Sequence, residues 1–443
     1  MPGIPLLTTI PPQMEPLPVD IFQLQRRDPA AWTALLSRLP ETDDVIVTAV
    51  AAEPLHNFSF IPPGRVIADP AHNIRRYVLT LADTSDPISF IAKQTNAAEA
   101  MVYELYGRPP ATAMPTCHYV HHDGDDSYVI LDDVPDHFPP AVWTPRQLDE
   151  VVATLARFHA AHWGRDSRRS VDWAATGPDF PHFHDRYDDE LPPRMSEGVS
   201  RFGSFPGREY LSGHALRAAG RLAPLFIQAA AGLAVMRKLN GWPGVLGESQ
   251  MAAVADLLDD PVPMLSPLLS LPITLLHGAP HPCHWRLTLF DEQFLIDWSE
   301  VQEGPGILDL MALIEGYPLA YKRPIEDVNA IGDPYLCLRP LPAVLEETIV
   351  DTYLLTLTAE LGGRIGARAF RDALPAARCL HVILTWFPFY ATWATDLPDP
   401  YFWQHVNRLS DTELGRYRDA PTVGMRHYLA GVFERFLRAY RNL

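Results

Sequence analysis

The stretch HGAPHPCHW, from His277 to Trp285, gathers side chains that could do chemistry. Four side chains with a nitrogen or sulfur donor fall within eight residues, namely His277, His281, Cys283 and His284. Imidazole and thiolate groups are ligands of Zn²⁺, and an imidazole can also serve as a general base. The spacing H-x-x-x-H-x-C-H matches no closed zinc site, which argues against zinc. For His281 and His284 a buried, hydrogen-bonded structural role is the alternative.

A second set of residues suits phosphoryl transfer, which needs a lysine on the phosphates, a carboxylate that holds this lysine, and metal ligands. Lys93 ends the strand-like segment ISFIAK, and Glu99 begins a helix-like segment six residues later, so the two can face each other. Asp297 follows the strand-like FLI, where a carboxylate could hold Mg²⁺. The alternatives are a solvent-exposed Lys93 and a turn-capping Asp297. Asp309, at the start of a helix-like segment, is assigned a structural role.

Three segments follow Lys93 and Glu99 in one order: LARFHAAHW, LLHGAPHPCHWRL and FLIDWSEVQEGPGILDLMAL. With this order the sequence resembles the aminoglycoside phosphotransferase and choline kinase-like family of small-molecule kinases, from about Asp44 to about Tyr317. The resemblance implies an α+β, bilobal protein kinase-like fold with a small antiparallel-sheet N-lobe and a large, mainly helical C-lobe. It also implies ATP or another nucleotide and Mg²⁺ as cofactors, and a small-molecule substrate.

The resemblance assigns roles by position. It makes Lys93 and Glu99 the pair that clamps the phosphates, and Asp297 the principal metal ligand. It assigns the hinge, the segment that hydrogen-bonds adenine, to Leu131, Asp132, Asp133 and Val134. C-terminal helices would line the acceptor pocket, and core packing is the alternative for the aromatic side chains Trp386, Phe387, Phe389, Tyr390 and Trp393.

The catalytic loop departs from the family's pattern, in which His-Gly-Asp is followed by Asn. Ala279 stands where the family has the Asp that accepts a proton, and His284 where it has the second metal ligand. Loss of a positioned general base costs roughly 10²- to 10⁴-fold in rate. The resemblance makes His277, which fits the family's pattern, a candidate catalytic residue, and His281 is a candidate substitute base.

Three interpretations of this loop stay open. In the first, the protein is a pseudokinase, or an enzyme repurposed for another reaction on a small molecule. In the second, it is an active ATP-dependent small-molecule O-phosphotransferase that uses a substitute base such as His281. In the third, it is a structural or regulatory partner protein. The presence of Lys93, Glu99 and Asp297 favours a nucleotide-dependent role, while only Gly64 is found where a glycine-rich loop would lie.

The lobes are expected at particular limits along the chain. Residues 1–44 would be an N-terminal extension with a helix at DPAAWTALLSRL, and 45–134 a β-rich N-lobe with one helix, NAAEAMVYELYG. Residues 135–443 would form the helical C-lobe, beginning with an amphipathic helix at TPRQLDEVVATLARFHAAHWG. This lobe would include the catalytic-loop remnant 277–285, the metal strand 294–300 and the acceptor-pocket helices.

Length and charge set limits on function. With 443 residues the chain is too long for one compact core. A formal charge of −18 argues against a nucleic-acid partner. Four scattered cysteines without a C-x-x-C pair, and no recognisable signal peptide, favour the cytoplasm. The apolar run from Leu222 to Met236 is expected to be a buried helix and not a membrane span. The oligomeric state is not indicated.

Overall fold

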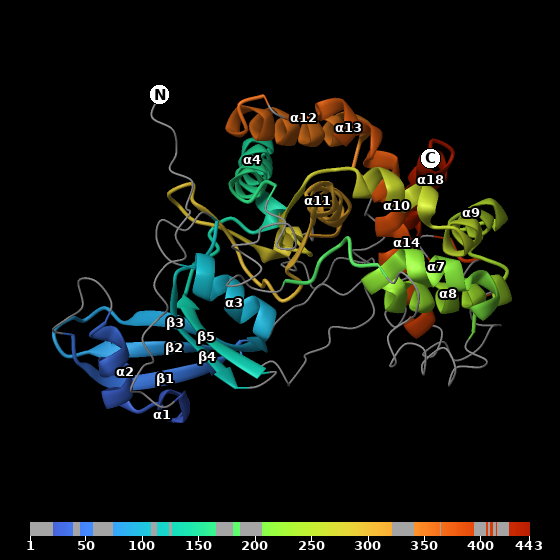
Figure 1. Cartoon of the computed structure of the whole chain (residues 1–443). Helices are drawn as coiled ribbons and strands as arrows, with labels where there is room; N and C mark the ends of the chain where they lie inside the picture. Colours follow the sequence, from blue (N-terminus) through green and yellow to red (C-terminus); the bar gives the residue numbers. More distant parts are fainter. Residues whose placement is uncertain are drawn as a thin grey trace. The chain divides into compact units, whose positions relative to one another are not determined.

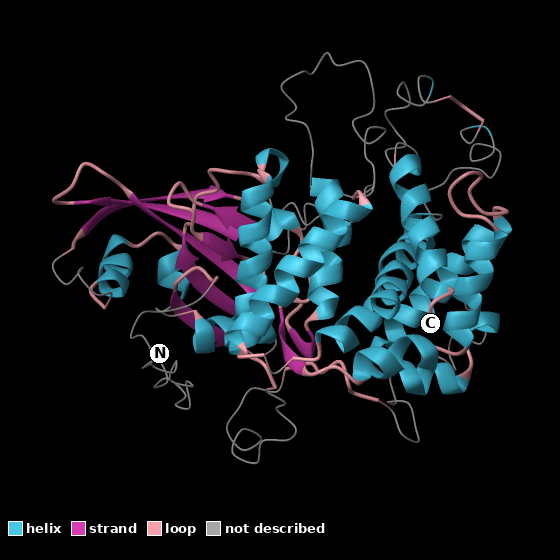
Figure 2. Cartoon of the chain, turned by 90° about the horizontal axis from the view of Figure 1, so that it is seen from above, coloured by secondary structure: helices cyan, strands magenta, loops and turns pink. Residues whose placement is uncertain are grey.

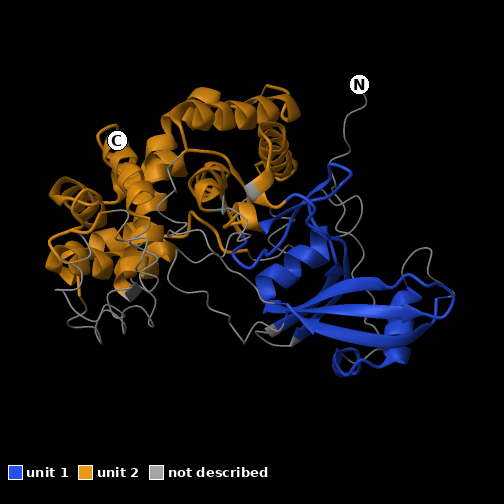
Figure 3. Ribbon diagram, turned by 180° about the vertical axis from the view of Figure 1, so that it is seen from behind, with its two compact units in different colours: residues 1–59, 67–138, 284–301 blue, residues 60–66, 139–283, 302–443 orange. Residues whose placement is uncertain are grey.

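The computed structural model describes most of the chain, and Figure 2 shows its helices and strands. The described residues are 21–38, 45–55, 74–107, 113–123, 126–164, 180–186, 206–320, 341–363, 365–393, 405, 408–410, 413 and 425–443. By their contacts they divide into two compact units (Figure 3). The described residues of 1–138 and 284–301 form the sheet unit, and those of 139–283 and 302–443 form the helical unit.

The sheet unit contains a five-stranded sheet with strand order β1-β2-β3-β5-β4, in which all neighbours are antiparallel (Figure 1). Its elements are α1 (Ile21–Gln25), α2 (Pro29–Leu36), β1 (Val47–Pro54), β2 (Ile74–Leu81), β3 (Ile88–Asn96), α3 (Ala97–Tyr106), β4 (Cys117–Asp123), β5 (Asp126–Asp132), β7 (Trp285–Leu287) and β8 (Gln293–Leu295). Strands β7 and β8 form a separate antiparallel pair. β3 is the middle strand of the large sheet, so a residue within it is flanked by strands on both sides.

One face of the sheet packs against α1 and α2. Tyr77 in β2 and Phe90 in β3 belong to the same buried cluster as Trp32 of α2, which is fully buried. The ring centroids lie 4.9 Å apart for Trp32 and Tyr77, and 6.0 Å apart for Trp32 and Phe90. Asp28 caps α2 by accepting the backbone N–H of Ala30 at 3.0 Å. The predicted N-terminal helix is thus part of the core of the sheet unit.

The opposite face carries the polar residues of β3. Because side chains alternate along a strand, Lys93 and Thr95 point away from the face that holds Phe90 and Ala92. α3 follows β3 without a loop, since Asn96 is both the last residue of the strand and the N-cap of the helix. Its side chain accepts the backbone N–H of Glu99 at 2.9 Å. One continuous segment therefore carries Lys93, on the strand, and Glu99, in the first turn of the helix.

The helical unit contains most of the helices and one short strand pair. Its elements are η1 (Pro140–Val142), α4 (Pro145–Ala161), η2 (Arg208–Tyr210), α7 (Gly213–Ala219), η3 (Gly220–Leu222), α8 (Ala223–Lys238), α9 (Glu248–Asp259), α10 (Val262–Leu269), β6 (Ile273–Leu276), β9 (Gln302–Pro305), α11 (Ile307–Ala320), α12 (Ala343–Glu360), α13 (Ala367–Asp372), α14 (Leu374–Trp393) and α18 (Arg426–Tyr440). The short helix η4 (Pro282–His284) ends at the first residue of the segment that belongs to the sheet unit. β6 is buried along its whole length and pairs antiparallel with β9.

Helix α8 packs tightly on α14 in the core of the helical unit. A Cβ atom on Gly232 of α8 would lie 1.7 Å from the carbonyl oxygen of Phe387, so only glycine permits this approach. By length and composition alone, Gly213–Lys238 is the one stretch of the described chain that could cross a membrane. However, 56% of its most apolar window is buried inside the fold, as expected for a core helix. Trp386, Phe387 and Tyr390 are likewise buried, in agreement with core packing.

The expected α+β class is confirmed, because an antiparallel sheet and a set of helices are both present. The expected helix after Thr144 is α4, whose N-terminus has the reciprocal hydrogen bonds of a capping box between Thr144 and Gln147. By its contacts the segment 284–301 groups with the sheet unit, for example through the N–H of Leu295, which donates to the carbonyl of Ala113 at 2.7 Å. The lobe limits expected from the sequence stay a prediction. Residues 56–73, where only Gly64 suggested a phosphate loop, lie outside the described residues.

Candidate functional site

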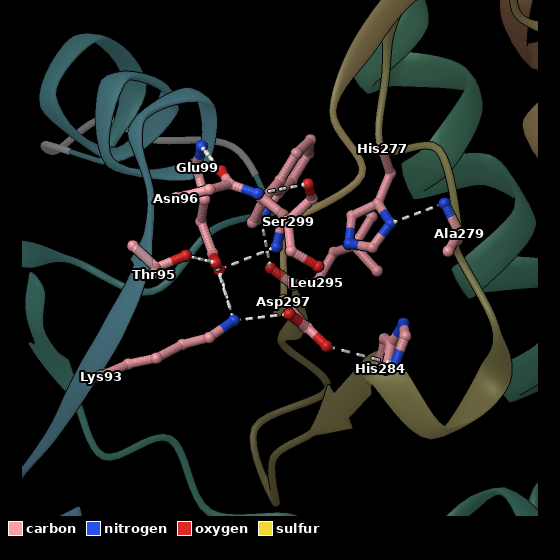
Figure 4. Close-up of polar contacts among 11 residues, drawn as sticks. Lys93, Thr95, Asn96, Glu99, His277, Ala279, His284, Leu295, Asp297 and Ser299 are labelled. Atoms are coloured by element: carbon pink, nitrogen blue, oxygen red, sulfur yellow. Dashed lines mark hydrogen bonds and ion pairs between the residues drawn. The ribbon is translucent and has the colours of Figure 1, made fainter. Parts of the chain in front are cut away.

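Lys93 makes ion pairs with two carboxylates of the sheet unit, Glu99 and Asp297 (Figure 4). Its Nζ lies 2.7 and 3.0 Å from the two oxygens of Glu99, and 2.5 Å from Oδ1 of Asp297. Lys93 is 5% exposed and Glu99 is 0% exposed, so water does little to satisfy these charges. The alternative of a solvent-exposed Lys93 is therefore wrong.

Further hydrogen bonds fasten Glu99 and its neighbours. The hydroxyl of Thr95 donates to Oε2 of Glu99, and the N–H of Trp298 donates to Oε1 at 2.9 Å. The side-chain amide of Asn96 donates to the carbonyl of Ser299 at 2.9 Å. Figure 4 shows how these contacts tie the segment around Asp297 to the junction of β3 and α3.

Asp297 lies two residues beyond the end of β8, and its backbone has a φ of +66°. This left-handed conformation is uncommon for residues other than glycine, although aspartate tolerates it better than most. Strained backbone of this kind is concentrated at functional sites. Oδ2 of Asp297 lies 3.7 Å from Nε2 of His284, so its two oxygens face different partners.

The carboxylates affect the ionisation of nearby groups. Burial is the strongest single influence on Lys93 and would lower its pKa, but Glu99 and Asp297 together raise that pKa above its usual value. For Tyr103 on α3, burial raises the pKa well above its usual value, and the two carboxylates raise it further. Lys93 is therefore cationic at neutral pH.

Asp297 and His284 are the two predicted metal ligands, and the structure brings them together. Proteins usually bind Mg²⁺ through one or two carboxylates, while phosphate oxygens and water complete the coordination. Among the described residues, no group of three or more His, Cys, Asp and Glu side chains could hold a metal ion. The donor set thus fits a cation that is shared with phosphate oxygens, although the imidazole of His284 suits a softer cation than Mg²⁺.

The predicted hinge, Leu131–Val134, covers the end of β5 and the two residues after it. The carboxylate of Asp132 lies 2.6 Å from Nε2 of His118. Burial would raise the pKa of Asp132, but the hydrogen bond and charge of His118 lower it overall. The carboxylate of Asp133 accepts a hydrogen bond from Arg76 at 2.6 Å. Because both side chains have protein partners, recognition of a base at this hinge would use the backbone.

In the helical unit the predicted catalytic loop follows β6 and is held by Asp309 of α11. The N–H groups of His277 and Gly278 donate to the carboxylate of Asp309 at 2.7 and 3.0 Å. Gly278 has a φ of +87°, which favours glycine. The ring of His277 is fully buried, and its Nδ1 accepts the N–H of Ala279 at 3.3 Å. This histidine therefore supports the backbone of the loop.

Asp309 also belongs to a buried polar network that sequence reasoning did not find. Its Oδ2 lies 3.2 Å from Nε2 of His159, and Nδ1 of His159 lies 2.7 Å from the hydroxyl of Tyr353. The structural role predicted for Asp309 agrees with these contacts. A histidine on the apolar face of α4, four residues after the buried Leu155, was a possible signal, because a buried imidazole needs a hydrogen-bond partner.

The predicted site residues thus fall into two groups. The sheet unit brings together the four charged or metal-binding candidates, and it also contains the hinge. The helical unit holds Ala279 and the two histidines predicted as catalytic, His277 and His281, within one loop. The predicted roles of all these residues stay predictions.

No model of a protein family matches the sequence, and no curated protein is similar to it. Solved structures are similar to it. A choline/ethanolamine kinase family protein from Mesorhizobium loti is 14% identical, with 93% of this chain and 98% of that chain covered and a TM-score of 0.40. An amicoumacin kinase in complex with AMP-PNP and Ca²⁺ is 12% identical, with 93% and 95% covered and a TM-score of 0.40. An aminoglycoside phosphotransferase from Alicyclobacillus acidocaldarius is 14% identical, with 83% and 89% covered and a TM-score of 0.39.

The structural neighbours are choline kinase-like and aminoglycoside phosphotransferase-family kinases. The family that the sequence resembles has the same description. The three identities are 14% or lower and the TM-scores are 0.40 or lower, so these similarities carry no argument about this chain. Functional proposals for this chain therefore depend on its own residues.

Proposed function

We propose that the sheet unit binds the phosphates of a nucleotide, together with a divalent cation, at Lys93 and Asp297. The buried ion pairs of Lys93 with Glu99 and Asp297 carry this proposal. A buried ion pair adds little net stability, because an apolar pair of similar size would fill the space without the cost of desolvation. Stability alone therefore does not account for a buried lysine between two carboxylates.

Each residue would have a distinct task. The ammonium of Lys93 would donate hydrogen bonds to phosphate oxygens, and such charge-assisted bonds are among the stronger ones. Glu99, held by Thr95 and by the N–H of Trp298, would keep Lys93 in place. Asp297 and His284 would hold the cation, which would neutralise part of the phosphate charge.

We further propose that this kinase-fold protein has lost ordinary phosphotransfer and is a pseudokinase, or an enzyme repurposed for another reaction on a small molecule. Ala279 carries this second proposal, since its methyl group cannot take a proton from an attacking alcohol. A cytoplasmic location and the absence of nucleic-acid and membrane partners stay predictions.

The second candidate function is an active ATP-dependent small-molecule O-phosphotransferase with His281 as substitute base. Its support is the position of a partly exposed imidazole two residues after Ala279. Phosphoryl transfer depends more on electrostatic stabilisation than on the base, so slow turnover is compatible with this loop. However, Nδ1 of His281 already faces the thiol of Cys283 at 3.1 Å.

Calorimetric titration with the non-hydrolysable AMP-PNP and Mg²⁺ tests the binding proposal. We expect Lys93→Met to weaken binding by roughly 10- to 100-fold, the size of a lost hydrogen bond to a charged group. Asp297→Asn should weaken binding only when the cation is present. Lys238→Met, at an exposed lysine at the end of α8, is the matched control and should bind like the wild type.

Two results would overturn the binding proposal. One is a wild-type protein that binds neither adenine nor guanine nucleotides with Mg²⁺ or Mn²⁺. The other is an equal loss of affinity in the Lys93 and Lys238 variants, which would indicate attraction to the surface alone. Circular dichroism of each variant shows whether the fold is kept.

A further inference from the structure

We propose that the outer edge of β1 is a dimerisation surface, at which β1 of a second copy of this chain adds antiparallel to the five-stranded sheet. β1 is the last strand at one end of the order β1-β2-β3-β5-β4 (Figure 1). Within the described residues β2 is its strand neighbour. The edge of a sheet presents a row of backbone N–H and C=O groups that another strand can bind. This proposal does not depend on nucleotide binding.

A hydrogen bond just beyond the end of β1 indicates which of its backbone groups point away from β2. The N–H of Leu55 donates to the carbonyl of Ile74 at 2.9 Å, as part of the β1–β2 ladder. In an antiparallel pair, residues that bond to the partner strand alternate with residues that do not. Counting back in steps of two, Ala51 also bonds to β2. The backbone N–H and C=O groups of Val50 and Ala52 therefore face outward.

The sequence of β1 selects one register for pairing with its own copy. Pro54 has no N–H to donate, and the register with β2 shifts at the start of the strand, which ends the regular ladder there. The outward groups of Val50 and Ala52 remain. In an antiparallel pair of identical strands, Val50 of each copy lies opposite Ala52 of the other, and each such pair exchanges both N–H···O=C bonds. Ala51 then lies on the two-fold axis.

The side chains of β1 favour this pairing. No charged residue occurs from Val47 to Ala52, so repulsion between two chains of formal charge −18 is weak along this segment. The side chain of Ala51 is an exposed methyl group, which leaves room for the second copy at the axis. In the selected register Glu53 lies opposite Ala49 of the other copy, and like charges do not meet.

The opposite edge of the sheet, β4, has a different character. It carries His121, His122 and Asp123 along its second half. Charged and polar side chains along an edge are a common protection against the addition of another strand. In β1 such protection comes from Glu53 and Pro54, which stand only at its end. The uncharged edge of the sheet is therefore that of β1.

A disulfide cross-link at the two-fold axis tests the register. Directly opposite residues in a non-hydrogen-bonded antiparallel pair have Cα atoms about 4.5 Å apart, which a disulfide can span. We expect Ala51→Cys in the full-length chain to form a covalent dimer on mild oxidation, visible on a non-reducing gel and reversed by a thiol reductant. Ala49→Cys, also exposed, is the matched control. Its two copies would lie about 13 Å apart, so this variant should stay uncross-linked like the wild type.

Analytical ultracentrifugation measures the dimer without a cross-link. We expect the wild type to show a monomer–dimer equilibrium with a Kd at or below about 1 mM, the weak end of specific association. Ala52→Pro removes an outward N–H from each copy and leaves the bonds to β2 in place, so it should weaken dimerisation by roughly 10-fold or more. Ala52→Ser keeps the N–H and should dimerise like the wild type. Ala51→Glu, which places like charges opposite each other, should weaken the dimer as well.

Three results would overturn the proposal. The first is a wild-type protein that stays monomeric up to about 1 mM. The second is equal cross-linking of the Ala51→Cys and Ala49→Cys variants, which would indicate random collision. The third is unchanged dimerisation in Ala51→Glu, which would place the dimer contact on another surface. Because Ala51 is exposed, its variants keep the fold even if Ala52→Pro does not, and circular dichroism checks each of them.

Discussion

The sheet unit and the helical unit differ in how completely they hold the groups that we propose for phosphoryl transfer. In the sheet unit every charged group of the clamp is present, with Lys93 between Glu99 and Asp297. In the helical unit the backbone of the loop is held by Asp309, yet Ala279 puts a methyl group at the position that the resemblance assigns to the base. The difference indicates that the fold of this loop does not depend on the side chain at residue 279, because backbone N–H groups hold the loop whichever side chain follows.

Restoring the carboxylate should produce the largest effect. If the loop lacks only its base, Ala279→Asp should raise ATP hydrolysis or phosphotransfer to a small alcohol by roughly 10²- to 10⁴-fold. Ala279→Asn is the control, because it has nearly the same size but accepts a proton poorly. Phosphate release measures both variants. Unchanged activity in Ala279→Asp would mean that the helical unit lacks more than one group needed for phosphoryl transfer. The helical unit would then differ from the sheet unit by more than the base.

The next largest effect should distinguish the role of the Lys93–Glu99–Asp297 cluster from that of the loop after β6. Glu99→Gln and Asp309→Asn each leave buried partners uncompensated, which typically costs about 3–5 kcal/mol for a broken ion pair and about 1–3 kcal/mol for a lost buried hydrogen bond. Both variants should unfold at lower urea concentration, Glu99→Gln more so. Only Glu99→Gln should also lose AMP-PNP affinity. Equal losses of nucleotide affinity would show that the loop contributes to binding as much as the clamp does.

A smaller effect is expected on acidification, and it originates in the helical unit. The folded-state pKa of His381 is lowered to about 4, mainly by burial, while an ordinary histidine in the unfolded chain titrates near 6.5. The unfolded state therefore takes up this proton first, and stability that is present above pH 6.5 is lost as the pH falls toward 4. The loss is at most about 3 kcal/mol, because partial solvent contact reduces it.

Urea unfolding at several pH values measures this loss. His381→Gln should flatten the dependence of the free energy of unfolding between pH 6.5 and 4, while the exposed His214→Gln should leave it unchanged. If the slope persists in the His381 variant, another group of the protein is responsible for the acid sensitivity.

The smallest effect concerns the choice of cation in the sheet unit. His284→Asn replaces an imidazole next to Asp297 by an amide oxygen donor, which suits Mg²⁺ better. The ratio of AMP-PNP affinity with Mn²⁺ to that with Mg²⁺ should fall by roughly 10-fold, at the lower end of the range for a perturbed metal site. Mutation of His137, in the same unit, should not alter the ratio. An unchanged ratio in His284→Asn would exclude this imidazole from the cation site.

Sequence reasoning found the clamp because its central pair is local. Lys93 and Glu99 are six residues apart, and the cap residue Asn96 marks the change from strand to helix between them. Strand alternation and helix capping act over such short distances, so composition and spacing were sufficient. The third group, Asp297, is 204 residues away from Lys93, and only the resemblance to a kinase family joined it to the other two.

The network beneath the loop could not be predicted in the same way. His159 is 150 residues from Asp309 and 194 residues from Tyr353, and no periodic pattern links such positions. The pairing of His281 with Cys283 was also missed, although it is local, because the sequence does not specify the ring orientation that the space at Gly316 permits. Long-range hydrogen bonds and side-chain rotamers depend on packing that becomes visible only in the folded protein.

The return of residues 284–301 to the sheet unit has a consequence for biosynthesis. A nascent polypeptide acquires Lys93 and Glu99 almost together, but the ribosome must translate a large part of the helical unit before Asp297 emerges. The sheet unit therefore cannot be completed as an independent first step of cotranslational folding. A truncated polypeptide that stops after β5 would carry the lysine and its first carboxylate without the second.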